Sequence, residues 1–156
     1  RQDTIMKTEL SKLLAEKASE VHTVTPDTRV MDAVRAMNHH NIGALLVMES
    51  NTIVGIFTER DVLVRVVAPG LDPLTTEVKE VMTTNPTCVT SAMPVEEAMV
   101  LITGKRFRHL PVVENGQLCG LISSGDLTRW VVRDQQHQIE HLNAYITDTQ
   151  VWSAFS

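Results

Sequence analysis

A seven-residue stretch occurs twice in this chain and decides its fold. Residues 55–61 read Gly-Ile-Phe-Thr-Glu-Arg-Asp, and residues 120–126 read Gly-Leu-Ile-Ser-Ser-Gly-Asp. Each copy places a hydroxyl residue, Thr58 or Ser123, three positions before an aspartate, Asp61 or Asp126. Because an apolar helical pattern follows both copies, we expect each to be a strand that ends at the hydroxyl residue, with the aspartate in the first turn of the next helix.

This hydroxyl–aspartate spacing has two interpretations. In the first, Thr58 and Ser123 cap their helices, and the two aspartates stabilise the positive helix N-terminus. In the second, hydroxyl and carboxylate face one ligand: the carboxylate accepts hydrogen bonds from two adjacent sugar hydroxyls, and the free N–H groups of the helix suit a phosphate. Charge-assisted hydrogen bonds of that kind contribute about 1.5–3 kcal/mol each. Two copies at matching places favour the ligand interpretation.

The repetition extends well beyond the two stretches. Sliding the sequence by 65 positions matches it to itself without gaps, with agreement at apolar positions, turns and the aspartates. The matched pairs include Val24 with Val89, Ala33 with Ala98, Leu45 with Leu110, and Gly55 with Gly120. Each half is therefore predicted to run strand, helix, strand, strand, helix. Two such halves can lay their sheets against each other around a pseudo-twofold axis, with clefts between them.

The predicted fold class is mixed α/β (α+β), with extra segments before the first repeat and after the second. A helix is expected over Thr4–Ala18, and Leu10 and Leu13 give it an apolar face that we expect to pack across the other half. A C-terminal helix is expected to run to about Tyr145, before an apolar tail. The predicted divisions are an N-terminal helical segment at 1–20, the first repeat at 21–68, a linker at 69–77, the second repeat at 78–134, and the helical extension and tail at 135–156.

Composition argues against several classes of protein. The chain has 156 residues and a formal net charge of −5 at pH 7. A negative balance argues against a nucleic-acid partner, which needs a basic face, and no apolar run is long enough to span a bilayer. Cys88 and Cys119 fall in predicted strands and are expected to be buried free thiols. The first residues, 1–3, are neither an initiator methionine nor a signal peptide, so we expect that the start was trimmed and that any targeting segment was lost with it.

Catalytic motifs are missing from the sequence. It contains no Gly-x-Ser-x-Gly, no Walker loop and no Cys-x-x-Cys, so we do not expect an enzyme. His39 and His40 are adjacent at a helix end, where side chains about 100° apart cannot both aim at one metal ion. Asp61 and Asp126 fall in separate, symmetry-related places, which argues against a pair of catalytic acids. We therefore expect no metal site and no catalytic cofactor.

The repeated motifs also indicate a family. The residues involved are Val24–Pro26, Val30–Met37, Ala44–Val47 and Gly55–Asp61 in the first half, and Val81–Met82, Val89–Thr90, Arg108–Val112 and Gly120–Asp126 in the second. Together they resemble a tandem pair of CBS domains, the arrangement called a Bateman module, over residues 21–134. The closing stretch Leu142–Ile146 is similar to the stand-alone CBS-pair proteins of plants.

The resemblance implies a regulatory module that binds adenosine nucleotides between its two motifs. AMP is the first expectation, with ADP, ATP and S-adenosylmethionine as the others. In that family the aspartate accepts hydrogen bonds from both ribose hydroxyls, the hydroxyl residue lies near ribose or phosphate, and apolar side chains and backbone hold the adenine. Carried over, the expected ligand-binding residues are Val24, Ala44, Thr58, Arg60 and Asp61 for the first site, and Val89, Arg108, His109, Ser123 and Asp126 for the second.

The two expected sites differ in charge. The second has Arg108 and His109 where the first has Gly43 and Ala44. We therefore expect the second site to be more positive and to prefer a phosphorylated ligand, with Arg60, Arg108 and His109 as the phosphate-binding candidates.

The resemblance further implies partners and a compartment. Members of the family form homodimers and regulate a partner protein, which for the plant relatives includes thioredoxin-system proteins. The alternative is a dimeric interaction scaffold whose nucleotide sites are vestigial. The compartment would be mitochondrial or another organelle if a transit peptide was trimmed, and cytoplasmic otherwise.

Overall fold

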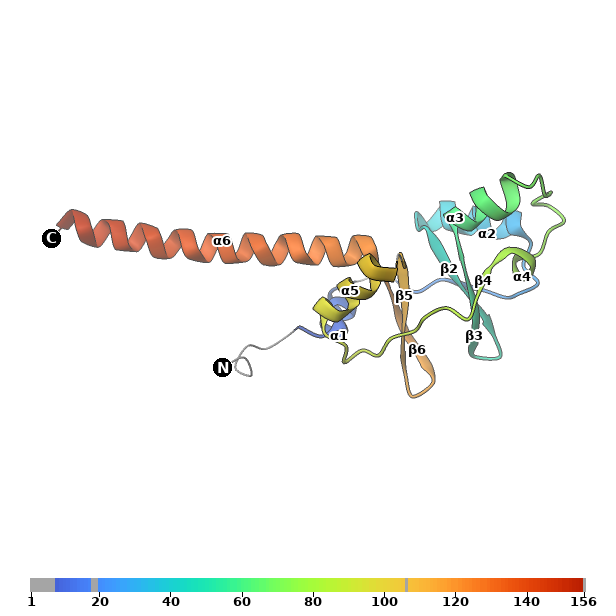
Figure 1. Ribbon diagram of the computed structural model, residues 1–156, viewed down its shortest axis with the longest axis horizontal. Helices are drawn as coiled ribbons and strands as arrows, with labels where there is room; N and C mark the ends of the chain where they lie inside the picture. The colour runs from blue at the N-terminus through green and yellow to red at the C-terminus, as the bar shows by residue number, and fades with distance from the viewer. Residues whose placement is uncertain (1–7, 18–19, 106, 156) are drawn as a thin grey trace.

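Two halves of the chain share one order of elements, and a single long helix ends the second half (Figure 1). This computed structural model describes residues 8–17, 20–105 and 107–155, and for residues 145–155 it describes the backbone alone. The first half comprises α1 (Leu10–Glu16), β1 (Thr23–Val24), α2 (Val30–His40), β2 (Ala44–Glu49), β3 (Thr52–Thr58), α3 (Glu59–Asp61) and η2 (Val62–Val67). The second comprises α4 (Val78–Val81), β4 (Thr83–Thr84), α5 (Val95–Lys105), β5 (His109–Glu114), β6 (Gln117–Ser123) and α6 (Ser124–Phe155). The expected mixed α/β fold of two repeats is confirmed.

Each half builds its sheet around an antiparallel hairpin. The sheet of the first half has the strand order β1-β2-β3-β4, with β4 of the second half at its edge; β1 is parallel to β2 and the other neighbours are antiparallel. In the second, β5 pairs with β6, and Val89 makes an isolated parallel bridge to Val112, where a counterpart of β1 would lie. Both hairpins turn through two residues at positive φ, Ser50-Asn51 and Asn115-Gly116, as a type I′ turn requires.

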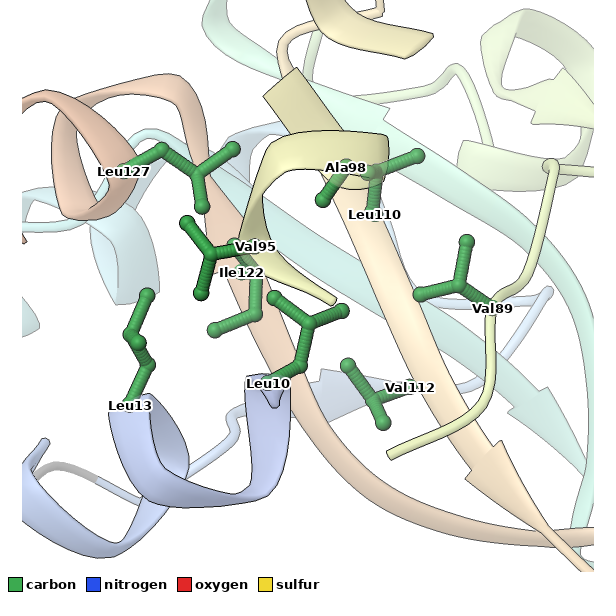
Figure 2. Packing of buried hydrophobic residues seen from close by; sticks show 9 residues of the cluster. All are labelled: Leu10, Leu13, Val89, Val95, Ala98, Leu110, Val112, Ile122 and Leu127. Atoms are coloured by element: carbon green, nitrogen blue, oxygen red, sulfur yellow. The ribbon is translucent and has the colours of Figure 1, made fainter. Parts of the chain in front are cut away.

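The short helix before each half packs into the core of the other half. Leu10 and Leu13 of α1 are buried among residues of the second half, whereas Val78 and Val81 of α4 are buried among residues of the first. Figure 2 shows the two leucines of α1 in the same cluster as side chains from α5, β5, β6 and α6. The expected packing of the N-terminal helix across the other half is confirmed, but the helix is shorter than predicted: Thr8, Glu9 and Lys17 are not helical, and residues 4–7 and 18 lie outside the described residues.

Matching backbone hydrogen bonds hold the two exchanged helices. The Leu10 N–H donates to the Met93 carbonyl at 2.9 Å, and the Val78 N–H donates to the Thr28 carbonyl at 2.8 Å. Thr28 and Met93 are partners in the 65-position repeat. The pseudo-twofold relation therefore includes these helices as well as the sheets.

A small apolar cluster joins the two sheets. Ala44, Leu46 and Ile56, from β2 and β3, are buried, and Leu118 and Leu121 of β6 pack against them. Burying these side chains between the sheets excludes water and is favourable in proportion to the apolar area covered. In this structure the cluster therefore holds the ends of β3 and β6, where the two hydroxyl residues lie, on either side of one small apolar contact.

The helix after the first aspartate departs from a regular α-helix. Only Glu59–Asp61 is α-helical, and Val62–Val67 forms a π-helical turn in which the Ala68 N–H donates to the Leu63 carbonyl at 2.9 Å. Valines occupy four of the six positions in this turn. Their branched side chains crowd the preceding turn of an α-helix, which favours the wider winding here.

The expected burial of the cysteines was wrong. Cys88 lies outside the described strands and is exposed, because only its neighbour Val89 pairs with β5. Cys119 does lie in β6, but it occupies an exposed position in the alternating pattern of that strand.

Helix α6 is longer than predicted. It continues to Phe155, past the expected end near Tyr145, so the stretch predicted as a tail has a helical backbone. Figure 1 shows α6 projecting away from both sheets. Ile139 and Leu142 on this projecting part are 56% and 57% exposed. Within the described residues, no helix combines the length and apolar character that a bilayer crossing requires.

Candidate functional site

The first hydroxyl–aspartate pair forms a reciprocal cap at the start of α3. Thr58 ends β3, and its Oγ1 accepts the Asp61 N–H at 3.2 Å. In return, the Asp61 Oδ2 accepts the Thr58 N–H at 3.0 Å. This capping box satisfies two backbone donors of the helix start. The capping interpretation of the spacing is therefore confirmed, and it uses one of the two carboxylate oxygens.

The second pair repeats this geometry at the start of α6. Ser123 Oγ accepts the Asp126 N–H at 3.1 Å, and Asp126 Oδ2 accepts the Ser123 N–H at 2.8 Å. The strand register is the same in both halves: Ala44 lies opposite Thr58, and His109 lies opposite Ser123. Each site therefore sets a capped aspartate beside the first residue of the partner strand.

One cleft contains both pairs. Its volume is about 1260 Å³, and elements of both halves line it. Eight of the ten expected site residues lie along it: Ala44, Thr58, Arg60, Asp61, Arg108, His109, Ser123 and Asp126. Since pockets for small molecules span roughly 300–1,000 Å³, this cleft is large enough for a nucleotide-sized ligand and more.

Val24 and Val89 are placed elsewhere. Val24 packs against the core of the first half, and Val89 is only 5% exposed within the core of the second. Neither is among the residues that line the cleft. Val21 and His22, just before β1, line the cleft instead. An adenine in this part of the cleft would therefore meet side chains that precede Val24 in the sequence.

The carboxylate of Asp61 retains acceptor capacity on one oxygen. Its Oδ1 lies 3.3 Å from Thr83 Oγ1, which donates a long hydrogen bond from β4. Arg65 Nε is 3.6 Å from the same oxygen, an ion pair that is longer than a hydrogen bond. Asp61 is one of two polar residues found buried among the described residues, with 6% of its surface exposed. Asp61 is among the residues that line the cleft, so a further donor can approach its carboxylate from there.

The carboxylate of Asp126 accepts more hydrogen bonds than that of Asp61. Lys17, directly after α1, donates from Nζ to Asp126 Oδ2 at 2.7 Å and to the Leu121 carbonyl at 2.8 Å. Arg129 Nη2 donates to Asp126 Oδ1 at 2.6 Å. Burial disfavours the charged carboxylate, but the hydrogen bonds from Lys17 and Ser123 outweigh it and hold the pKa of Asp126 below its usual value.

Histidines add titratable groups to the cleft. Burial, with the nearby charge of Lys17, lowers the pKa of His109, so this side chain is neutral at pH 7. The rings of His22 and His40 stack with their centroids 3.7 Å apart. Burial, and then the proximity of His22, lowers the pKa of His40 as well. Among the described residues, no group of three potential ligands forms a metal site.

Sequence reasoning missed several residues of the cleft. Arg65 and Arg129 follow their aspartates by four and three positions, a helical spacing that brings side chains together and could have identified them. Lys17 had no such signal, because its contact with Asp126 spans 109 residues.

Comparison with known proteins decides the family. The model of the CBS domain matches residues 15–68 and 78–133. The chain belongs to the CBS-domain family. The two hydroxyl–aspartate caps thus lie at corresponding places in two CBS motifs, and the resemblance inferred from the repeat is confirmed.

Relatives of this CBS pair include plant and bacterial proteins. The mitochondrial CBS domain-containing protein CBSX3 of Arabidopsis thaliana is 39% identical over 127 residues, which are 78% of this chain and 62% of that protein. A protein with CBS domains from Burkholderia ambifaria superposes with a TM-score of 0.77 and 41% identity, over 82% of this chain and 96% of that one. A hexameric CBS-CP12 protein from bloom-forming cyanobacteria gives a TM-score of 0.72 at 29% identity, over 80% and 68%. The chain spans only 62% of the length of CBSX3.

Proposed function

We propose that this CBS pair binds an adenosine nucleotide, with AMP as the first ligand, in the cleft between its motifs and thereby regulates a partner protein. The observation that supports this most is the position of the two capped aspartates in one cleft. At Asp61, which lines the cleft, capping occupies Oδ2 and leaves Oδ1 with one long hydrogen bond. That carboxylate can accept the two hydroxyls of a ribose, a charge-assisted contact.

The cations of the cleft suit a phosphate. Arg60 and Arg65 come from the first motif, Arg108 and Arg129 from the second, and Lys17 from α1. Arginine presents planar pairs of N–H donors that match phosphate oxygens. His109 can add a third kind of donor when a phosphate favours its protonation. A nucleotide with its ribose at an aspartate would thus find positive charge within the same cleft.

Regulation would act through the relative placement of the two motifs. A ligand that touches both halves favours the arrangement in which it makes more contacts, and it can shift that balance only by its difference in affinity. The apolar cluster between β2, β3 and β6 is small, with three buried residues. The halves can therefore change their relative placement without opening either core.

Self-association is part of the proposal. The turn η2 carries Leu63, Val64 and Val67, which are 64%, 55% and 62% exposed. Val132, the partner of Val67 in the repeat, is 46% exposed on α6. Exposed apolar side chains of this kind favour contact with another protein surface, and we take a second copy of this chain as that partner. The cyanobacterial relative is itself hexameric.

The compartment and regulated partner follow the plant relative. CBSX3 is a mitochondrial protein, so we propose a mitochondrial location. We also propose a regulated partner within the thioredoxin system, on the family resemblance alone. Co-purification from a mitochondrial extract, with and without AMP, tests this assignment. Recovery of the same proteins in both conditions would argue against nucleotide-dependent regulation.

Calorimetric titration tests the binding itself. AMP, ADP, ATP and S-adenosylmethionine are titrated into the wild type, Asp61→Asn and Asp126→Asn, which keep a cap acceptor but lose the charge. Each substitution should weaken binding at its own site by roughly 10- to 150-fold, the loss of about 1.5–3 kcal/mol from a charge-assisted contact. Asp32→Asn, an exposed aspartate on α2, is the matched control. No heat with any of the four ligands would overturn the proposal and leave the scaffold alternative.

A further inference from the structure

The two aspartates of the cleft differ in how many acceptor positions they still offer. A carboxylate has about four lone-pair sites, two on each oxygen. At Asp126, Oδ2 accepts the Ser123 N–H and Lys17 Nζ, and Oδ1 accepts Arg129 Nη2. Only one site remains there, whereas a ribose diol donates two hydroxyls. At Asp61, the two hydrogen bonds that occupy the carboxylate leave two sites.

We propose that Lys17 is the specificity-determining residue of the second site: it occupies the carboxylate that a ribose needs, so this site accepts only a nucleotide whose phosphate can replace Asp126 as the partner of the lysine. The first site, at Asp61, accepts the uncharged nucleoside as well. This inference rests on the proposed nucleotide binding and adds which ligand each site takes.

Lys17, rather than Arg129, determines whether a ribose can bind to the Asp126 carboxylate. The side chain of Arg129 is 70% exposed, so its ion pair with Asp126 is solvated and easily exchanged. Lys17 is 30% exposed and also donates to the Leu121 carbonyl, which gives its ammonium group two acceptors in place. Another anion of comparable strength is needed to draw the ammonium group away from the Asp126 carboxylate and the Leu121 carbonyl, and a phosphate is such an anion.

The position of Lys17 is set by the exchanged helix. Its N–H donates to the Leu13 carbonyl at 2.9 Å and ends α1. Leu10 and Leu13 bury the helix in the core of the second motif, with 0% and 5% exposure. The backbone of Lys17 is therefore anchored, and its flexible four-carbon side chain can swing from Asp126 to a phosphate within the same cleft.

The first site has no equivalent of this lysine contact among the described residues. Asp61 is 3.6 Å from Arg65 Nε, beyond hydrogen-bond distance, and its remaining donor is the neutral hydroxyl of Thr83. A ribose can take the place of that long hydrogen bond without separating a hydrogen-bonded ion pair. The difference between the sites thus lies in Lys17, although both motifs preserve the same cap.

Titration of adenosine and AMP tests this inference. Each ligand is titrated into a background with Asp61→Asn, which weakens the first site and leaves the second, and Lys17 is then replaced by Met, which keeps its length without its charge. The background protein should bind AMP and should bind adenosine much more weakly than AMP. Lys17→Met should bind adenosine about tenfold or more tighter than the background does, and AMP more weakly. Lys17→Arg, which keeps the charge, should retain the preference for AMP.

The controls separate the possible failures. Lys12→Met, an exposed lysine on the same helix, should leave both affinities unchanged. Lys17→Gln is a second neutral variant should the Met variant fold poorly. If either neutral variant binds adenosine as weakly as the background does, while AMP still binds and depends on Asp126, the role of Lys17 is overturned but nucleotide binding stands. If no protein, including the wild type, binds AMP or adenosine, the proposed function fails and this inference fails with it.

Discussion

Lys17 and Asp126 lie 109 positions apart in the sequence, yet Lys17 Nζ is 2.7 Å from Asp126 Oδ2. The contact exists because α1, which precedes the first CBS motif, packs in the core of the second. It places an ammonium group on the one carboxylate that caps α6 and lines the cleft. The packing of α1 in the core of the other half therefore places a charged group in the candidate site.

The stability contribution of this pair should depend on pH. The folded-state pKa of Asp126 is lowered, so the pair stabilises the protein above the ordinary aspartate pKa of about 3.9, and its contribution is lost as the pH falls through the lowered value. Because Lys17 is 30% exposed, Lys17→Met should lower the unfolding free energy by only about 1 kcal/mol near pH 7. Urea denaturation of both proteins between about pH 7 and pH 3 measures the difference.

That difference should shrink as the pH falls below the ordinary aspartate pKa. Arg129→Gln is the control, since its 70% exposed side chain should contribute little at any pH. A difference between wild type and Lys17→Met that stays constant across the range would show that the lysine acts through packing and not through its charge.

The two caps should contribute similarly to stability. Thr58→Ala removes the acceptor of the Asp61 N–H, and Ser123→Ala removes the acceptor of the Asp126 N–H. Each substitution should lower the unfolding free energy by about 1 kcal/mol, within the usual range of about 0.5–2 kcal/mol for the loss of an N-cap. Thr58→Ser and Ser123→Thr should restore most of it. Chemical denaturation measures all four variants, and an unchanged midpoint for the alanine variants would contradict the role of these hydroxyls as caps.

Sequence alone identifies the parts of the site that are local. The hydroxyl and aspartate of each motif are three positions apart, so one helix start brings them together, and helical spacing also places Arg65 and Arg129 beside them. The assignment of Val24 to the cleft depended instead on which face of β1 meets the other half. Pairing of β1 with β2 directs Val24 to the core of the first half. The sequence pattern of a two-residue strand is too short to specify that face.

Long-range contacts account for most of what the sequence could not specify. An apolar face on α1 predicts that the helix is buried, but not that it delivers Lys17 to the second aspartate. The exposure of Cys119 has a similar origin, because strand membership alone does not say which of two alternating faces is covered.

Burial of α1 in the second motif should make its leucines important for overall stability. Leu10 is 0% exposed, so Leu10→Ala should lower the unfolding free energy by about 2–5 kcal/mol through lost burial and the cavity that remains. Ser11→Ala, an exposed neighbour on the same helix, should change it by less than about 0.5 kcal/mol. Denaturation followed by tryptophan fluorescence of proteins that carry Trp152→Phe reports on this core, because Trp130 packs against the same cluster. A cost for Leu10→Ala no larger than that of Ser11→Ala would contradict this packing.

Self-association should depend on the exposed turn η2. Val67 is 62% exposed, and Val67→Glu would place a charge within the proposed apolar contact, where it must lose its hydration. We expect the dimer to dissociate at least tenfold more readily, measured by analytical ultracentrifugation over a range of concentrations. Gln117→Glu, at the exposed start of β6, is the control for added charge. An equal effect of both variants would argue against η2 as the interface.

Binding of a phosphorylated nucleotide should be accompanied by proton uptake at His109. Burial and the charge of Lys17 keep the pKa of this histidine low, so it is neutral in the protein without ligand. A phosphate in the cleft adds negative charge and raises that pKa toward or above the working pH, which draws in a proton. Calorimetry at about pH 6.5, the ordinary histidine pKa, in two buffers of different ionisation enthalpy, should therefore give different heats for AMP and equal heats for adenosine. His109→Gln should abolish the buffer dependence, while His40→Gln, which removes the other histidine with a lowered pKa, should retain it. The reverse pattern would place the phosphate beside the His22–His40 stack instead.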